Sequence, residues 1–564
     1  MPSITIDGKA LTYEGKQTIL QVALTHGVEI PHYCYHPGLS VVASCRICLA
    51  EVAQPNPKTG KLELIPKLMP TCQTPAADGM EVYVRSPKSV ANQKAVMEYL
   101  LINHPLDCPV CDQAGECHLQ DYSYRYGRAV SRFEDAKIKQ PVKDVGPHVK
   151  LYSDRCIMCS RCVRFTREVT GTGELAVFGR GSQEQIDVFP GQPLANEMSG
   201  NVVDICPVGA LLDKDFLFTQ RVWFLRVTPS IDGLTASGDN LWVHHNEGRI
   251  YRVKPRTNPG VNKWWISDEI RYGWKFVHAA ERLRTPRRMQ YGTQVDCGWP
   301  RIYADVAENL PRIVKEKSTG SGVVSGGTPG GISGTNPGGV LAVLVSPMLA
   351  SEEAYLLGKL ARALDPQAVL GVGPVPVQGE NKTFPGGYTI LAEKAPNARG
   401  VRAALTLLGG NAPVEFADFT KLLTDKATKV AAVIVTGNYP SAWVTKELTA
   451  ALARKFLVVL DTLPSEVTAR ADVLLPGATW LEKAGSFANH RNVHQAFAAV
   501  IPVCDGARTE GQVALDLLAA CGLAAAEVYD PMKVRGQMGA AFSAAVHQPA
   551  ELTLREPAMQ YVAL

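Results

Sequence analysis

The first hundred residues carry apolar positions in short, regular patterns. An alternating pattern over residues 3–13, interrupted by Asp7-Gly8, predicts a β-hairpin with a tight turn. From Thr18 to His26 the apolar residues recur at helical spacing, and Gly27 follows as a C-terminal cap. Further elements are predicted as strands at Leu49–Val52 and Leu62–Ile65, and as an amphipathic helix over 89–101 with Val90, Ala91, Ala95, Val96, Tyr99 and Leu100 on its apolar side.

The C-terminal half has longer apolar runs that alternate with helical segments. Strands are predicted at Val340–Ser346, Val369–Val372, Val430–Thr436 and Leu457–Leu460, and helices at Glu352–Leu364, Val401–Leu408 and Val444–Lys455. This order predicts an α/β domain with a mostly parallel sheet. The tract 318–339 is rich in Gly, Ser, Thr and Pro without apolar periodicity, which predicts a flexible linker. Its glycines neither follow a strand nor open a helix, so a phosphate-binding loop is not favoured.

The overall composition narrows the function classes. A chain of 564 residues is expected to form several domains, and a formal net charge of +4 gives no basic field for nucleic acid. No apolar run has the length of a membrane span, and the N-terminus lacks the basic and apolar regions of a secretory signal. We therefore expect a cytoplasmic protein with no direct membrane span, able to dock on a membrane-bound partner.

The cysteines form the strongest chemical pattern in the chain. Eleven of the 14 lie at or before position 206, and with one histidine they form three successive sets of four potential ligands. The sets are Cys34, Cys45, Cys48 and Cys72; His104, Cys108, Cys111 and Cys117; and Cys156, Cys159, Cys162 and Cys206. In a reducing compartment such clusters are more often metal ligands than disulfides, and thiolates are the ligands of iron–sulfur clusters.

The spacing differs between the three sets. Hairpin, helix and cysteine-bearing loop follow the order of a small β-grasp ferredoxin domain, in which the first set can hold a two-iron cluster; a zinc site is the alternative. The second set fits a four-iron cluster with one imidazole ligand, or zinc. In the third, Cys-x2-Cys-x2-Cys can occupy three corners of a cubane, and Cys206, followed by Pro207, most simply closes the same cluster.

Four arginines surround the third set: Arg155, Arg161, Arg164 and Arg167. Two interpretations stay open. They form a solvated helix face, or they stabilise an anionic cluster or contact a partner.

The order of these sets resembles one known family. The segments 103–112, 154–165 and 199–211 are similar to those of the large iron–sulfur subunit of respiratory NADH:quinone oxidoreductase, complex I, and of its hydrogenase and formate-dehydrogenase relatives. Beyond residue 217, the segment 224–273 is similar to the small domain that opens molybdenum–pterin oxidoreductases. Many members hold a further four-iron cluster there, but this chain has no cysteine between Cys206 and Cys297, so we expect that cluster to be absent. Residues 461–483 resemble the core of a molybdopterin domain, but Cys297, Cys504 and Cys521 lie outside its metal-ligand motif.

This resemblance implies a multidomain α+β and α/β protein. The expected domains are a β-grasp 2Fe-2S ferredoxin-like domain (1–80), a 4Fe-4S domain with one His and three Cys (81–146), a 4Fe-4S ferredoxin-like domain (147–217), a molybdenum-oxidoreductase 4Fe-4S-type domain without cluster cysteines (218–276) and a degenerate molybdopterin-oxidoreductase-like domain (277–564). The implied cofactors are one 2Fe-2S and two 4Fe-4S clusters, with no flavin and no molybdenum. The chain contains no flavin or nicotinamide fingerprint, so it is not expected to oxidise NADH alone.

The implied function is electron transfer within complex I, from a flavin subunit that oxidises NADH toward quinone. The implied partners are that flavin subunit, its small 2Fe-2S partner, and the downstream iron–sulfur and quinone-site subunits. The implied location is the peripheral arm at the cytoplasmic face of the inner membrane. The alternatives are an electron-transfer subunit of an NAD-linked formate dehydrogenase or an iron-only hydrogenase, and a zinc-stabilised binding module.

Overall fold

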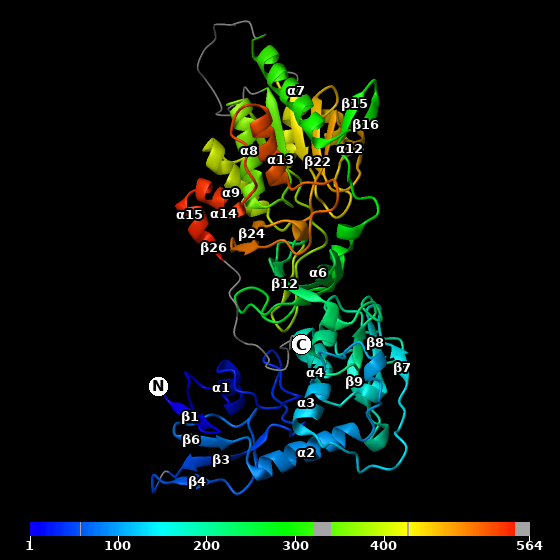
Figure 1. Cartoon of the computed structure of the whole chain (residues 1–564), viewed down its shortest axis with the longest axis vertical. Coiled ribbons are helices and arrows are strands. Elements are labelled where there is room, and N and C mark those ends of the chain that lie inside the picture. The colour runs from blue at the N-terminus through cyan, green and yellow to red at the C-terminus, as the bar shows by residue number, and fades with distance from the viewer. Residues whose placement is uncertain (57, 320–339, 426–427, 548–564) are drawn as a thin grey trace.

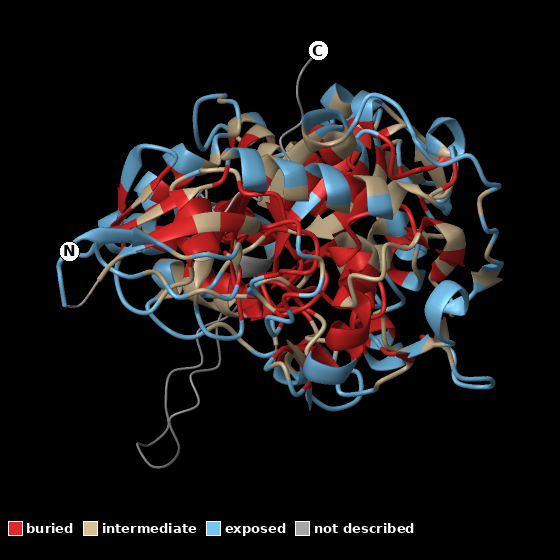
Figure 2. Cartoon of the chain, turned by 90° about the horizontal axis from the view of Figure 1, so that it is seen from below, coloured by how far each residue is buried: buried red, intermediate tan, exposed pale blue. Residues whose placement is uncertain are grey.

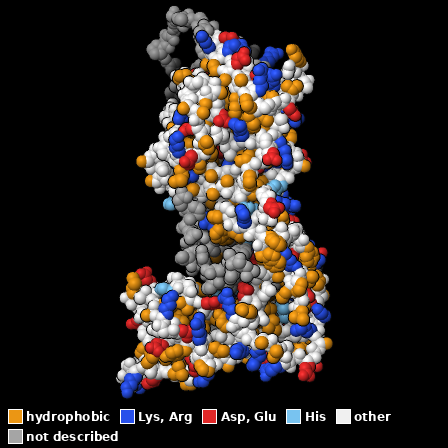
Figure 3. All heavy atoms as spheres, in the orientation of Figure 1, with side chains coloured by type: hydrophobic (Ala, Val, Ile, Leu, Met, Phe, Trp, Pro, Cys, Tyr) orange, Lys and Arg blue, Asp and Glu red, His pale blue; other side chains and the backbone are white. Residues whose placement is uncertain are grey.

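The computed structural model describes residues 1–56, 58–319, 340–425 and 428–547. The molecule is elongated, with the N-terminal region at one end, a small β domain in the middle and the C-terminal α/β region at the other end (Figure 1). Seen along the long axis, buried residues lie in the interior, and exposed helices and loops surround them (Figure 2). On the face seen in Figure 3, acidic and basic side chains are intermixed.

The N-terminal sheet confirms the predicted hairpin and helix. Its strand order is β2-β1-β6-β3-β4, and β5 pairs with β3. The strands are β1 (Ser3–Ile6), β2 (Lys9–Thr12), β3 (Leu49–Pro55), β4 (Leu62–Leu64), β5 (Met69–Pro70) and β6 (Met80–Tyr83). Asp7 and Gly8 form the turn with φ of 45° and 84°, values that suit a tight hairpin. Helix α1 (Ile19–Thr25) begins at a capping box on Thr18 and packs its apolar side on the sheet.

Helix α2 (Pro87–Leu101) forms as predicted, and Val96 and Leu100 of the predicted apolar side pack against the core, but the fully buried positions are different ones. Its buried residues are Ser89, Gln93 and Met97, whereas Tyr99 is 78% exposed. The reason is hydrogen bonding to the neighbouring sheet: the Ser89 hydroxyl donates to the carbonyl of Tyr83, and the Gln93 amide donates to the carbonyl of Val84. These hydrogen bonds offset the cost of removing the two polar side chains from water, so a polar side of the helix can be buried.

The region from 102 to 225 consists of short elements joined by long loops. Its helices are η1 (Cys108–Val110), α3 (His118–Tyr126), η2 (Ser153–Arg155), α4 (Arg161–Arg164), the π-helical turn η3 (Phe165–Val169), η4 (Gly181–Gln183), α5 (Asn201–Ile205) and η5 (Val222–Phe224). Its strands are β7 (Val142–Asp144), β8 (Val149–Tyr152), β9 (Leu175–Phe178), β10 (Gln185–Val188) and β11 (Leu211–Asp213), paired as β11-β8-β7 and β10-β9. A shared apolar core beneath these elements includes Cys117, Cys162 and Cys206.

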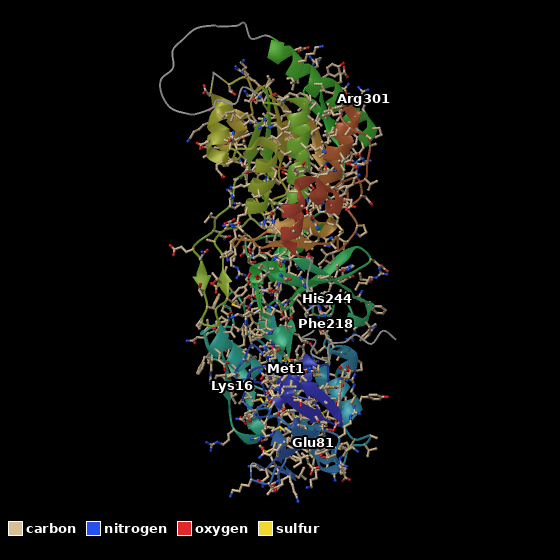
Figure 4. All side chains as sticks on the ribbon, turned by 90° about the vertical axis from the view of Figure 1, so that its left-hand side faces the viewer. Met1, Lys16, Glu81, Phe218, His244 and Arg301 are labelled. Carbon is tan, nitrogen blue, oxygen red and sulfur yellow. The ribbon has the colours of Figure 1, made fainter. Side chains whose placement is uncertain are left out.

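The middle of the molecule is a three-stranded antiparallel sheet. It contains β12 (Arg226–Ile231), β13 (Asn240–Asn246) and β14 (Arg249–Pro255), followed by α6 (Asp268–Tyr272) and η6 (Gly273–His278). Strands β13 and β14 pair antiparallel, with a register shift between His244 and His245. Figure 4 shows the labelled Phe218 and His244 where this sheet meets the N-terminal region.

The C-terminal region is built on a seven-stranded sheet of order β16-β15-β23-β22-β21-β17-β18. Its strands are β15 (Arg287–Gln290), β16 (Thr293–Asp296), β17 (Leu341–Val345), β18 (Val369–Val372), β21 (Ala432–Thr436), β22 (Phe456–Asp461) and β23 (Val473–Pro476). The run from β23 to β18 is parallel, which confirms the predicted α/β sheet, and the hairpin β15–β16 adds an antiparallel edge. Since both faces of the parallel part are covered, its strands are almost entirely apolar and buried, except for the terminal Thr436 of β21 and Asp461 of β22.

The helices of this region are α7 (Trp299–Thr319), α8 (Ser351–Leu364), α9 (Ala398–Gly409), α10 (Phe416–Thr424), α11 (Lys446–Ala451), α12 (Glu466–Arg470), η7 (Trp480–Glu482), α13 (Glu510–Ala520), α14 (Pro531–Met538) and α15 (Ala540–Ala545). The remaining strands are β19 (Lys382–Thr383), β20 (Thr389–Ile390), β24 (Gly485–Ala488), β25 (His494–Phe497) and β26 (Val546–His547). The predicted linker at 318–339 lies outside the described residues except for its first two positions, which belong to α7. No helix among the described residues is long and apolar enough to cross a membrane.

Candidate metal centres

The first four cysteines lie in pairs beside the N-terminal sheet. The Sγ atoms of Cys48 and Cys72 are 3.5 Å apart. Their hydrogen bond lowers the pKa of Cys48 to about 7 and raises that of Cys72. A second hydrogen bond, between Cys34 and Cys45, lowers the pKa of Cys34 to about 5 and raises that of Cys45. Two thiol pairs fit a two-iron cluster, in which each iron takes two thiolates.

Left-handed residues shape the loop that carries this set. Ala43 and Arg46 have φ of 51° and 59°, which turn the chain on both sides of Cys45. The Arg46 carbonyl accepts a hydrogen bond from Asn92 of α2 at 2.9 Å. The Thr71 hydroxyl donates to the carbonyl of Cys48 at 3.0 Å, so the distant Cys72 segment is held against the loop.

The second set surrounds the start of α3, which has Cys117 at its N-cap. Cys108, Cys111 and Cys117 interact electrostatically with one another. Burial raises the pKa of the Cys117 thiol to about 12, whereas Cys108 is exposed. Burial, followed by the charges of Arg155 and Lys137, lowers the pKa of His104 to about 4. Its Nδ1 atom is buried without a hydrogen-bond partner, so His104 is neutral at pH 7 and retains an unused ring nitrogen that fits a metal ligand.

The third set forms one enclosed site. Cys156, Cys159, Cys162 and Cys206 all line a single cavity, with apolar walls from Leu151, Ile157, Ile186, Val208, Ala210 and Leu211. Met158 and Ser160 have φ of 53° and 57°, which coil the first three cysteines around the cavity. Burial raises the pKa of all four thiols, that of Cys159 to about 11.

Four buried thiols cannot ionise together without a compensating positive charge. The donor chemistry and the apolar walls of this cavity therefore fit an iron–sulfur cluster. Among the described residues, no group of three or more His, Cys, Asp and Glu side chains is arranged as a site for a single metal ion.

The third set lies between the other two. Pro207, directly after Cys206, accepts a hydrogen bond from the backbone N–H of His118 at 3.1 Å, and its carbonyl oxygen lies 4.0 Å from the Cys117 sulfur. On the opposite side, the guanidinium of Arg164 donates to the carbonyls of both Cys34 and Cys159. The spatial order therefore differs from the sequence order.

Buried charged side chains connect these loops, and the sequence alone did not predict their contacts. Arg155 lies over the Tyr152 ring and forms an ion pair with Asp107 at 2.9 Å. Glu116, which directly precedes the ligand Cys117, forms hydrogen bonds with both terminal nitrogens of Arg252 at 2.8 Å each. The alternation of Arg and Cys in 155–164 was the sequence pattern that indicated Arg155. No sequence pattern indicated Glu116.

Five family models match successive parts of the chain. They are described as a 2Fe-2S iron-sulfur cluster binding domain (2–87), an NADH-ubiquinone oxidoreductase-G iron-sulfur binding region (93–132), the ferredoxin-like domain of NADH-quinone oxidoreductase subunit 3 (146–212), an NDSU1/NuoG-like 4Fe-4S domain of NADH-ubiquinone oxidoreductase (225–275) and Molybdopterin oxidoreductase (376–519). The fourth match contains no cysteine in this chain.

Curated relatives match over the N-terminal part. The G subunit of the NADH-quinone oxidoreductase of Rickettsia bellii is 37% identical over 57% of this chain and 45% of its own length. The NADH-ubiquinone oxidoreductase 75 kDa subunit of Reclinomonas americana is 39% identical over 56% of this chain and 44% of its own. NADH dehydrogenase [ubiquinone] iron-sulfur protein 1 of Solanum tuberosum is 41% identical over 56% of this chain and 42% of its own length. The chain thus spans less than half the length of these relatives.

A solved structure of an NAD+-reducing [NiFe]-hydrogenase in the H2-reduced state is 28% identical, covering 39% of this chain and 91% of that chain at a TM-score of 0.34. That TM-score does not establish a shared overall fold.

The fold and these matches define a modular iron–sulfur protein, with a 2Fe-2S domain and 4Fe-4S domains in front of a molybdopterin-oxidoreductase-like domain. Such an order of modules is shared by several oxidoreductases, and the matched descriptions distinguish among them. The N-terminal part of this chain is similar to the large iron–sulfur subunit of NADH-quinone oxidoreductase, which the matched proteins name as its G subunit or 75 kDa subunit.

Proposed function

We propose that this chain is an electron-transfer subunit of complex I that relays single electrons from an NADH-oxidising flavin subunit toward quinone. The observation that carries the proposal is the single cavity lined by Cys156, Cys159, Cys162 and Cys206, which come from segments far apart in the sequence. The names of its relatives support NADH-quinone oxidoreductase as the enzyme. In this proposal the chain is one subunit of that enzyme and is not active alone.

The proposed ligand sets are those of the sequence prediction. Cys34, Cys45, Cys48 and Cys72 would hold a 2Fe-2S cluster, and His104, Cys108, Cys111 and Cys117 a 4Fe-4S cluster; Cys156, Cys159, Cys162 and Cys206 would hold the other 4Fe-4S cluster. The proposed domains are 1–80, 81–146, 147–217, 218–276 and 277–564. When bound, iron–sulfur clusters accept and release one electron at a time.

The protein's own residues would position and insulate these groups. Burial of Cys162 and Cys206 excludes water, and the backbone around Met158 directs an N–H at the Cys156 sulfur over 3.4 Å. The contacts of Pro207 and Arg164 support a relay with the Cys156 set between the Cys34 set and the His104 set. The exposed Cys108 supports an exit toward the next subunit at the His104 set.

The proposed partners are the flavin and NADH-binding subunit, its small 2Fe-2S partner, and the downstream iron–sulfur and quinone-site subunits. The proposed location is the peripheral arm of the membrane complex, at the cytoplasmic face of the inner membrane. The names of the relatives, which are subunits of NADH-quinone or NADH-ubiquinone oxidoreductases, support a place in such a complex.

The test is low-temperature EPR of the reduced chain, combined with iron, zinc and molybdenum analysis. We expect three cluster signals, and we expect Cys108→Ala to remove one four-iron signal and stop NADH-to-quinone electron flow in the assembled complex while NADH oxidation by the flavin continues. Cys521→Ala is the matched control, because Cys521 lies at the end of α13, outside all three sets. A colourless protein with stoichiometric zinc would support the zinc module instead, and bound molybdenum would support a formate dehydrogenase.

A further inference from the structure

Two buried arginines of α4 connect the Cys34 loop to the Cys156 set. Arg161 and Arg164 are 2% and 8% exposed. Arg161 donates to the carbonyl of Tyr35 at 2.5 Å and to the carbonyl of Ile205 at 3.2 Å. It therefore joins the residue after Cys34 to the residue before Cys206.

Arg164 makes the more direct connection. One of its terminal nitrogens donates to the carbonyls of Cys34 and Cys159, at 3.4 Å in the second case, and the other donates to the carbonyl of Ser40. A single planar guanidinium thus contacts the backbone of one proposed ligand in each of two sites. The fork geometry of arginine allows this, whereas a lysine ammonium offers one compact donor group.

Arg164 forms no ion pair within 4.0 Å among the described residues, because the nearby carboxylate of Glu168 accepts hydrogen bonds from the N–H and hydroxyl of Ser40. Glu168 attracts the guanidinium, but burial outweighs this attraction and lowers the pKa of Arg164. The Nε atoms of Arg161 and Arg164 are both buried without a hydrogen-bond partner. An uncompensated buried charge costs several kcal/mol, on the order given for buried ions, unless an anion lies nearby. Clusters held by thiolates on either side supply that anionic charge.

We propose that Arg164 is a positioning residue shared by the two-iron site and the Cys156–Cys206 site, which fixes the two ligand loops against each other and sets the potentials of both clusters together. The inference rests on the proposed function, because it requires both clusters. A fixed positive charge stabilises the more negative, reduced form of each cluster, so it raises both midpoint potentials.

The experiment uses the full chain with its clusters assembled, and follows each EPR signal in a redox titration. In Arg164→Gln, the midpoint potentials of the two-iron signal and of the Cys156-set signal both shift to lower values. The His104-set signal stays unchanged, since none of the hydrogen bonds of Arg164 reaches that set. Arg164→Lys keeps the charge and brings both potentials back toward those of the wild type. Arg167→Gln, three residues later and exposed, is the matched control and shifts neither.

A shift of one signal alone, or of neither, overturns the inference. If Arg164→Gln does not retain both clusters, hydrogen exchange of Arg164→Lys decides, because loss of the fork should raise exchange in 34–40 and in 156–162 together. Faster exchange in one of these segments alone, or in neither, also overturns it. The absence of cluster signals from the wild-type chain would instead refute the proposed function, so the two failures are distinguishable.

Discussion

The two ends of this molecule are stabilised by different means. In the C-terminal region, strands β17, β21 and β22 are buried along almost their whole length and pack with α8 and α13 into one apolar core. The region from 102 to 225 has helices as short as α4 and α5 and strands of three or four residues, held by cysteines and buried charges. The C-terminal region therefore rests on a continuous apolar core, whereas the core of 102–225 includes cysteines, so we expect only the latter to depend on bound iron–sulfur clusters.

The largest expected difference follows removal of iron. We expect oxidation and chelation to unfold the ligand loops, because their buried thiols then lose the metal that compensates their charge. Hydrogen exchange should accelerate by more than roughly tenfold across 34–48, 104–117 and 156–162, and remain unchanged in β17 and β22. Equal acceleration in both regions would contradict the comparison.

Glu116 tests the buried charges between domains. Burial raises the pKa of Glu116, but Arg252 and Lys254 outweigh this effect and lower it to about 2. Glu116→Gln should cost roughly 3–5 kcal/mol of unfolding free energy at pH 7, because two cations lose their buried partner.

The interaction of Glu116 with Arg252 and Lys254 also predicts that stability depends on pH. Since the folded pKa of Glu116 lies below its ordinary value of 4.5, its contribution is complete above that value and is lost as pH falls toward 2. Denaturant titrations of the cluster-loaded chain should therefore show a constant gap between wild type and Glu116→Gln from about pH 8 to about pH 5, where Glu116 stays ionised. Glu197→Gln removes an exposed ion pair with Lys382 and should cost less than about 1 kcal/mol; a Glu116→Gln gap that closes within this range would argue against the assignment.

Leu357 tests the apolar end. It is fully buried in α8, so Leu357→Ala should cost about 2–5 kcal/mol and leave all three EPR signals intact. Leu407→Ala, on the neighbouring helix α9 and 52% exposed, is the control. Loss of a cluster signal in Leu357→Ala would show that the two ends do not fold independently.

The smallest effect is expected on α2. Tyr99→Ser should change stability by no more than about 0.5 kcal/mol, because its ring is exposed. If Tyr99→Ser lowered the unfolding free energy of the isolated chain by more than about 2 kcal/mol, as measured by thermal unfolding, Tyr99 would belong to a buried side of α2, as the apolar periodicity predicts.

The sequence predicted those parts of the fold that local pattern determines. The Asp7-Gly8 turn, the cap of α1 and the apolar strands of the C-terminal sheet each depend on a few neighbouring residues. The buried side of α2 could not be predicted, because Ser89 and Gln93 are buried through hydrogen bonds to a strand that precedes the helix.

The sequence predicts the three ligand sets mainly from the short spacing of their cysteines, but that spacing does not determine how the sets are arranged in space. Of the four arginines near the third set, Arg167 is exposed, whereas Arg155, Arg161 and Arg164 are buried and do not form a solvated helix face. Nothing in the spacing distinguishes Arg164 from Arg167; the difference comes from the Cys34 loop, more than a hundred residues earlier, which covers Arg164.

The separation of Cys162 from Cys206 has a consequence for biosynthesis. Because 43 residues separate the two cysteines, translation must continue well past the Cys-x2-Cys-x2-Cys motif before a fourth thiol is available for the central cavity. The His104–Cys117 loop waits longer still, because Arg221 donates to the carbonyl of Cys111. During translation, the four thiols of the Cys34 set are present once residue 72 has been made, whereas the Cys156 set lacks its fourth thiol until residue 206.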